Sequence, residues 1–258
     1  MANNQDLSSP RTIKSVFTMF RIVEHLESAD GARITDIARD LDLAKSSVYQ
    51  HLSTLGELGY VVKEDDLYFV GLGFLRLAEY ARHRKEAYRI AQPMVHELAN
   101  ESGERAQFFV EEHGRAIYLH TSHGRHAVPA DRMIGTRRYM HSSAGGKAIL
   151  AYYSQSRVKA IIEQWGLPAE TTETITSREA LFEELAAIRE RGFSINENES
   201  IDGLTALGVP ARNGTGSVFG SFSISGPSHR LTDKATRQKM IDLLLGKANE
   251  YELKVTYS

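Results

Sequence analysis

The chain has 258 residues, of which 41% are hydrophobic and 25% charged, and its formal net charge is −2. This composition is that of a globular protein with a core, and the absence of cysteine excludes disulfides, thiolate metal sites and a thiol nucleophile. No apolar run approaches the roughly 20 residues that span a bilayer, and the first residues lack a secretory signal, so we expect a cytoplasmic protein without membrane contact.

The first 60 residues predict three helices. Apolar side chains recur at helical spacing over residues 12–28, and Asp30-Gly31 then makes a turn. A short helix is expected next, with Thr35 as its N-cap. Residues 42–44 form a tight connection to a longer helix, which we expect to stop at Gly59 because glycine suits the position after a helix end.

Residues 60–70, YVVKEDDLYFV, predict two short strands around an acidic turn at Glu64, Asp65 and Asp66. A helix, a short helix, a longer helix and a hairpin in this order are typical of a winged helix-turn-helix. In that motif the third helix reads the major groove of double-stranded DNA. Because the net charge is slightly negative, DNA binding depends on where the cations lie.

The longer helix has two contrasting faces. Its apolar stripe comprises Leu43, Val48, Leu52, Leu55 and Leu58. Its other face carries a cation and short or hydrogen-bonding side chains, namely Lys45, Ser46, Ser47, Tyr49 and Gln50. Short side chains let a helix start approach a phosphate closely, and a glutamine can bond the edge of adenine with two hydrogen bonds. The alternative is an ordinary solvated face; the surrounding helices and hairpin favour base reading.

The rest of the chain predicts a mixed domain. Residues 73–90 form a cation-rich helical segment that we interpret as the connector. QFFVEE and RAIYLHTS predict two strands around His113-Gly114. TSREALFEELAAIRERG, residues 176–192, predicts a helix with a capping box from Thr176 to Glu179 and Gly192 at its end. FGSFSISG predicts a further strand, and residues 232–251 a last helix. Irregular alternation of helices and strands favours an α+β fold with a central antiparallel sheet.

The segment HSSAGGKAIL, residues 141–150, is not a phosphate loop, because that motif needs glycine at 141 and serine or threonine at 148. It predicts a helix that begins near Ala144 and is capped by Ser142 or Ser143. Such a start, with only small side chains, could bind a carboxylate. The alternative is close packing of the glycines against a neighbouring strand.

Two other kinds of chemistry are weaker predictions. Five histidines lie within 29 residues, and nitrogen ligands suit zinc, but a solvated loop is the favoured interpretation; they are His113, His120, His123, His126 and His141. An acid–base enzyme could be drawn from Glu111, Glu112 and His113, or from His141 with a neighbouring serine. No G-x-S-x-G elbow supports it. We therefore expect no catalytic residue, no cofactor and no metal site.

The helix-turn-helix segment LAKSSVYQHLSTLGELGYV, with RTIKSVFTMFRIVEHL before it, resembles the IclR family of transcriptional regulators. The later segments HSSAGGKAIL, ITSREALFEELAAIRERGFSINENE, GLTALGVPA and FSISGPSHRLT resemble that family's effector-binding domain in the same order. The resemblance covers roughly residues 11–256. It implies a winged helix-turn-helix domain over 1–73, a linker helix over 74–87 and a GAF-like α/β effector domain over 88–258.

The resemblance also implies site residues. The residues facing DNA would be Lys45, Ser46, Ser47, Tyr49 and Gln50, with phosphate anchors at Arg11 and Lys14. The residues around the effector would be Ala144, Gly145, Asn196, Leu204, Ala206, Ser223 and Ser225. Three positions depart from the family: Gln50 replaces a frequent arginine, the wing turn is acidic, and Asn196 replaces a frequent acid.

We therefore expect a ligand-responsive regulator, such as a repressor, that binds a palindromic operator as a homodimer or as a dimer of dimers (a tetramer). Its effector would be a small-molecule carboxylate, a keto, sugar or aromatic acid, which alters DNA affinity through its differential affinity for two states of the protein. The alternative is a small-acid-binding enzyme or binding protein whose helical N-terminal domain serves only dimerisation.

Overall fold

The computed structural model describes residues 12–128 and 134–257. The chain forms two compact units that divide between Ala81 and Arg82, inside the segment 74–87 expected to link the domains. The exact domain boundaries remain a proposal, and each unit is described by itself. Within the described ranges, no helix combines the length and the apolar character needed to cross a membrane.

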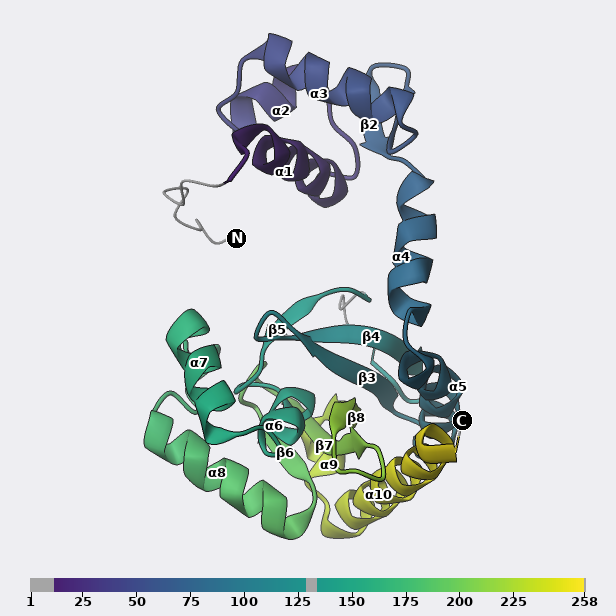
Figure 1. Ribbon diagram of the computed structural model, residues 1–258, viewed down its shortest axis with the longest axis vertical. Helices are drawn as coiled ribbons and strands as arrows, with labels where there is room; N and C mark the ends of the chain where they lie inside the picture. Colours follow the sequence, from purple (N-terminus) through teal and green to yellow (C-terminus); the bar gives the residue numbers. More distant parts are fainter. Residues whose placement is uncertain (1–11, 129–133, 258) are drawn as a thin grey trace. The chain divides into compact units, whose positions relative to one another are not determined.

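The first unit is a winged helix-turn-helix, as predicted (Figure 1). Its core is made by apolar residues from all three helices, including the fully buried Ile22, Ile37 and Val48. The strands form an antiparallel hairpin, the wing, in which Val61 pairs with Val70. The elements are α1 (Lys14–Ser28), α2 (Ile34–Asp40), α3 (Lys45–Glu57), β1 (Val61–Glu64) and β2 (Leu67–Val70).

Two details of this unit differ from the prediction. Thr35 is not the N-cap of α2: the N-cap is Arg33, which makes no side-chain cap bond. The reason is that Ala32 forms a β-bridge with Tyr68, and the helix begins directly after this extended segment. Leu58 is not part of the apolar stripe, because α3 ends at Glu57 and Leu58 is 64% exposed.

The cation-rich segment 73–90 is not one helix. It contains α4 (Gly73–His83) and the start of α5 (Glu86–Ser102), with Lys85 in an extended conformation between them. The division suits the helix dipoles, because Arg82 and His83 lie in the last turn of α4 and Glu86 lies in the first turn of α5.

The second unit is built on a six-stranded antiparallel sheet in the order β5-β4-β3-β8-β7-β6, which confirms the expected α+β fold. The strands are β3 (Arg105–Glu112), β4 (Arg115–His123), β5 (Arg137–Tyr139), β6 (Ser194–Glu197), β7 (Leu204–Arg212) and β8 (Val218–Pro227). The helices after α5 are α6 (Ala144–Leu150), α7 (Gln155–Trp165), α8 (Arg178–Arg191), α9 (Ser228–Leu231) and α10 (Lys234–Tyr257).

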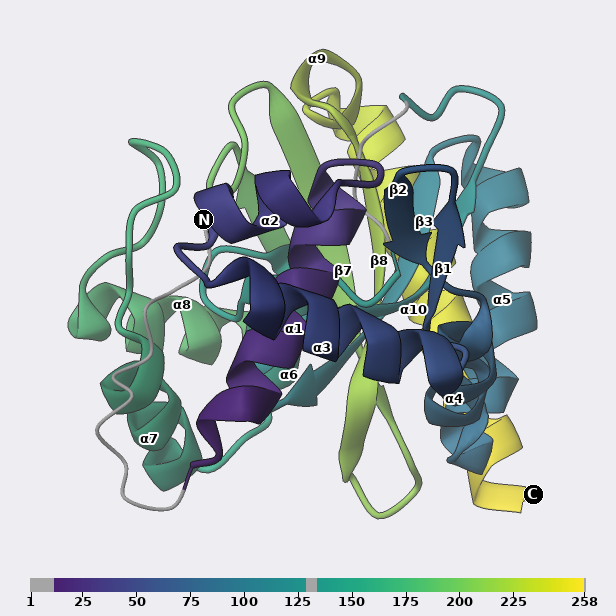
Figure 2. The same ribbon diagram turned by 90° about the horizontal axis from the view of Figure 1, so that it is seen from above.

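Helices cover both faces of this sheet (Figures 1 and 2). On β3, Ala106, Phe108 and Val110 face the core formed with α5 and α10. Phe109 belongs to the opposite core, formed with α6, α7 and α8. The capping box expected from Thr176 is absent from α8: Ser177 is the N-cap and accepts a hydrogen bond from the Ala180 N–H.

Candidate functional site

The outer face of α3 is open to solvent. Lys45, Ser46, Tyr49 and Gln50 are exposed, with Tyr49 at 58%, and Ser47 is half-buried. The N-cap of α3 is Ala44, which has no side-chain oxygen to bond the N–H groups of the first turn. These N–H groups can therefore bind a phosphate oxygen.

The other predicted DNA contacts lie at the ends of this unit. Lys14 is the first residue of α1 and is exposed, whereas Arg11 lies outside the described residues. The wing turn at Asp65 and Asp66 is exposed and acidic, so it repels phosphate. Lys63 is the cation of the wing, and its Nζ lies 5.7 Å from the centre of the Tyr68 ring.

In the second unit, one cavity lies between the sheet and α6. All seven residues predicted around the effector lie in its wall: Ala144, Gly145, Asn196, Leu204, Ala206, Ser223 and Ser225. Sequence reasoning missed six further lining residues, namely Arg105, Gln107, Phe109, Tyr118, Ser143 and Ser200. The strand register explains the grouping, because Arg105 lies opposite Ser225 and Ser225 lies opposite Ala206.

The α6 wall is tied to the sheet by side chains that bond its backbone. Ser194 Oγ donates to the carbonyl of Ala144 at 2.6 Å, and Ser221 Oγ donates to the carbonyl of Gly145 at 2.9 Å. A Cβ at Gly145 would lie 2.3 Å from the Phe109 ring. Small residues are therefore required for close packing, which is the alternative that the sequence had left open.

Part of the predicted anion site at the start of α6 is used by the protein itself. The helix has only seven residues, and Ser143 Oγ accepts a hydrogen bond from the N–H of Gly146. The Phe109 ring lies where a Cβ of Gly145 would project, so this glycine also serves packing, and the anion site at the helix start remains a prediction.

Asn196 links the loop after β6 to the residues before α6 by hydrogen bonds. Its Nδ2 donates to the Ser142 carbonyl at 2.6 Å and to Ser200 Oγ at 3.2 Å, and its Oδ1 accepts from the Glu199 N–H at 2.9 Å. Both amide donors are thus used by the protein. Asn196 positions the loop after β6 against α6, and little of its hydrogen-bonding capacity remains for a ligand.

The polar groups on the middle strands have more capacity. Ser223 Oγ donates to the Leu207 carbonyl at 2.7 Å and can still accept. Ser225 Oγ accepts from Gln107 Nε2 at 2.7 Å and can still donate. Arg105 is the one charged side chain among the described lining residues, and its guanidinium lies 5.4 Å from the centre of the Tyr118 ring.

A buried charge cluster supports the same loop from behind. Lys147 on α6 is 1% exposed and lies 2.5 Å from Glu199 Oε1 and 3.5 Å from Glu184 Oε1. Burial raises the pKa of Glu199, although the nearby Lys147 ammonium acts in the opposite direction. Lys147, Glu184 and Glu199 are not among the residues that line the cavity.

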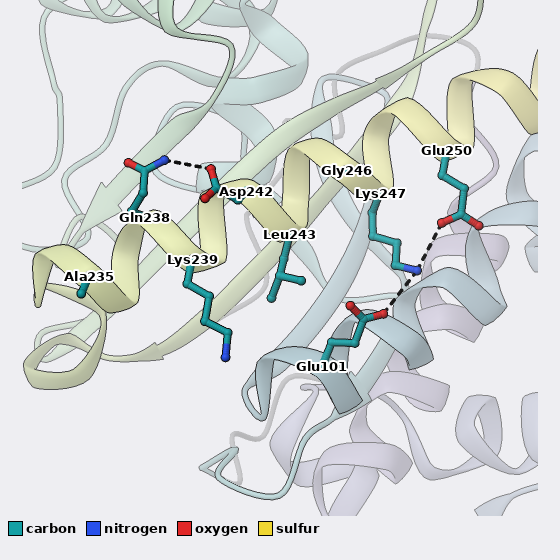
Figure 3. Close-up of a pocket in the computed structure, with 9 residues that line it drawn as sticks. All are labelled: Glu101, Ala235, Gln238, Lys239, Asp242, Leu243, Gly246, Lys247 and Glu250. Carbon is teal, nitrogen blue, oxygen red and sulfur yellow. Dashed lines mark hydrogen bonds and ion pairs between the residues drawn. The ribbon is translucent and has the colours of Figure 1, made fainter.

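The cavity is nearly closed, with a volume of about 20 Å³. This is room for roughly one water molecule, so a ligand must open it. A wider depression of about 700 Å³ lies along the outside of α10 (Figure 3). Two lysines line this depression, Lys239 and Lys247, and Lys247 is paired with Glu97, Glu101 and Glu250. The lining also carries the carboxylates Glu101, Asp242 and Glu250, so an acid meets more negative charge here than in the cavity, whose described lining has none.

The histidines occupy separate environments. His120 Nε2 bonds the Tyr88 carbonyl and His141 Nε2 the Pro168 carbonyl, and burial lowers the pKa of His141. Within residues 12–128 and 134–257, no three His, Asp or Glu side chains are grouped to hold a metal ion. The Ser142 hydroxyl donates a hydrogen bond to Glu170, and the Ser143 hydroxyl donates one to the Tyr139 carbonyl. Neither serine is therefore hydrogen-bonded to His141 as a nucleophile would be to its base.

Comparison with known proteins agrees with both units. Residues 16–65 match the IclR helix-turn-helix domain, and residues 80–251 match the family described as bacterial transcriptional regulator IclR C-terminal. The chain is 31% identical to a probable HTH-type transcriptional regulator ArcR of Halobacterium salinarum, over 98% of this chain and 97% of that protein.

Two solved structures share the fold. The IclR of Thermotoga maritima is 25% identical, with a TM-score of 0.79 over 93% of this chain and 96% of that one. An IclR homolog from Microbacterium hydrocarbonoxydans, solved with 4-hydroxybenzoate, is 22% identical, with a TM-score of 0.78 over 95% of this chain and 100% of that one. The chain therefore belongs to the IclR family of transcriptional regulators, with a helix-turn-helix DNA-binding domain and an effector-binding C-terminal domain, and is a regulator rather than an enzyme.

Proposed function

We propose that the protein binds a palindromic operator as a dimer, through the exposed face of α3, and that a small organic acid in the cavity between α6 and the sheet changes its affinity for DNA. The observation that carries the DNA part is the face at Lys45, Ser46, Tyr49 and Gln50, which is left uncovered by its own unit. Gln50 would read adenine, and the positive and N–H-rich start of α3 would lie against phosphate.

The dimer is supported by apolar surface that the first unit does not bury. None of the α4 residues, all of them in the described part of the chain, is buried, and Leu75 and Tyr80 are 60% and 72% exposed. On α1, Phe17 and Phe20 are also exposed. Exposed apolar surface of this kind is typical of a protein–protein interface, and we assign it to a second copy of the chain. A two-fold dimer would present two recognition helices, one to each half of a palindromic operator.

The effector is proposed to be an acid because the described lining residues of the cavity include one cation and no carboxylate. A buried arginine favours an anion that can take two parallel hydrogen bonds. Leu204, Ala206, Phe109 and Tyr118 supply the apolar part of the wall. Opening the cavity around the acid would give the ligand its influence over the conformation of the domain.

The DNA proposal is tested by gel shift and fluorescence anisotropy with the region upstream of the protein's own gene. Gln50→Ala should lower operator affinity and relax preference at one or two base positions, with about 1–3 kcal/mol of discrimination lost. Unchanged base preference would remove Gln50 as a reader, and absence of binding to duplex DNA at low salt would remove the DNA proposal.

The dimer is tested by light scattering. Tyr80→Glu should give monomers that bind the operator weakly, whereas the control Leu253→Glu, at a 61% exposed position on α10, should leave the mass unchanged. A monomeric parent protein that still binds the full operator would contradict the proposal.

A further inference from the structure

The cavity wall contains a hydrogen-bond acceptor that the protein leaves unsatisfied. Within the described part of the chain, Gln107 Oε1 is buried without a hydrogen-bond partner, and the Gln107 side chain is 1% exposed. The other end of the amide is fixed, because Nε2 donates to Ser225 Oγ at 2.7 Å. A buried acceptor without a donor costs free energy, so a group that donates to it is favoured at this place.

The neighbouring charge fixes what else the ligand must carry. Arg105 and Gln107 lie two residues apart on β3 and therefore point to the same side of the sheet, about 7 Å apart along the strand. A carboxylate at Arg105 and a nearby hydroxyl at Gln107 can bridge this distance with one hydrogen bond each. Tyr118, under the guanidinium, holds the arginine side chain at the cavity wall.

We propose that Arg105 and Gln107 make the cavity selective for small hydroxy acids over the keto acids of the same carbon skeleton, with Arg105 binding the carboxylate and Gln107 Oε1 accepting a hydrogen bond from the hydroxyl. A keto oxygen cannot donate, so a keto acid leaves Gln107 Oε1 buried and unsatisfied and also places two acceptors together. A site built around a hydrogen bond to a hydroxyl discriminates strongly against an analogue without it. This inference rests on the proposed role of the cavity as the effector site.

The test is calorimetric titration of the full-length protein with matched pairs: lactate and pyruvate, 2-hydroxybutyrate and 2-oxobutyrate, mandelate and benzoylformate. We expect the hydroxy acid of at least one pair to bind, and to bind at least about tenfold more tightly than its keto partner. Equal binding, or tighter binding of the keto acid, overturns this inference and leaves the proposed effector site intact. Binding of no acid in the panel overturns the effector proposal itself, and this inference with it.

Variants then assign the two roles. Gln107→Met keeps the volume and should reduce the preference for the hydroxy acid to less than about threefold, whereas Gln238→Met, on the exposed side of α10, should leave it unchanged. Arg105→Gln should weaken every bound acid at least about tenfold and leave the neutral lactamide unaffected. Retained preference in Gln107→Met overturns the role of Gln107, and retained acid affinity in Arg105→Gln overturns the role of Arg105. The wild-type pairs test the selectivity without any variant.

Discussion

Replacing Gly145 by alanine tests whether the glycine is required by packing. The added Cβ would lie 2.3, 2.8 and 2.9 Å from three atoms of the Phe109 ring, closer than carbon atoms approach without repulsion. The ring has little room to withdraw, because Phe109 is 3% exposed and its centre lies 4.3 Å from that of Tyr118. We therefore expect a loss of about 2–3 kcal/mol in unfolding free energy, at the upper end of overpacking costs.

The assay is urea denaturation followed by the fluorescence of Trp165, the single tryptophan of the chain, which packs in the same core as Phe109. Phe109→Leu should cost about 1–2 kcal/mol alone, and Gly145→Ala should add little to it, because the colliding ring is gone. The control Gly246→Ala, in open space on α10, should stabilise by about 0.5–1 kcal/mol. Additive losses in the double variant, or wild-type stability of Gly145→Ala, would refute the packing argument.

Three further predictions concern charges. Lys14→Ala should weaken binding to every duplex and lower the slope of log K against log salt by about 0.9; an unchanged slope means no phosphate contact. Burial lowers the pKa of His141 in the folded protein below its ordinary value of 6.5, so the unfolded chain binds a proton more readily. The free energy of unfolding should therefore fall as the pH drops below 6.5, and urea titrations at a series of pH values measure this fall. His141→Gln should flatten it. Lys147→Met should lower the free energy of unfolding by about 3–5 kcal/mol, because it leaves Glu199 buried without its cation. Adding Glu199→Gln to Lys147→Met should recover most of this loss. Equal stability of the single and double variants would contradict the buried pair.

Local patterns were enough for most elements of the fold. Gly59 follows α3 with a φ of 78°, as a residue after a helix end should, and the wing and the β3–β4 hairpin lie where their turns predict them. The two N-caps at Thr35 and Thr176 were predicted wrongly because a bridge or a neighbouring serine decided where the helix begins. Such competition between adjacent residues is not visible in a pattern.

The cavity was harder to predict, because its walls join strands that are distant in sequence. Arg105 appears in the sequence as a charge at the start of an apolar strand, and only the pairing of β3 with β8 places it beside Ser225. Asn196 was predicted to face a ligand, yet its amide bonds depend on Ser142, 54 residues away. Alternation along β3 does put Arg105 and Gln107 on one face, and this signal could have found both residues.

The closed state of the cavity and the ties on α6 together determine how an effector could act. An acid larger than one water molecule must widen the cavity, and we expect it to do so by moving the α6 wall from the sheet, against the bonds from Ser194, Ser221 and Asn196. The free energy needed for that opening makes the net binding free energy of the acid less favourable. The same opening distinguishes the conformation that binds the acid from the one that does not. A ligand shifts the equilibrium between two conformations only by the difference in its affinity for them. We therefore expect modest affinity for the effector together with a strong influence on the protein's conformation, both arising from the hydrogen-bonded contact between α6 and the sheet.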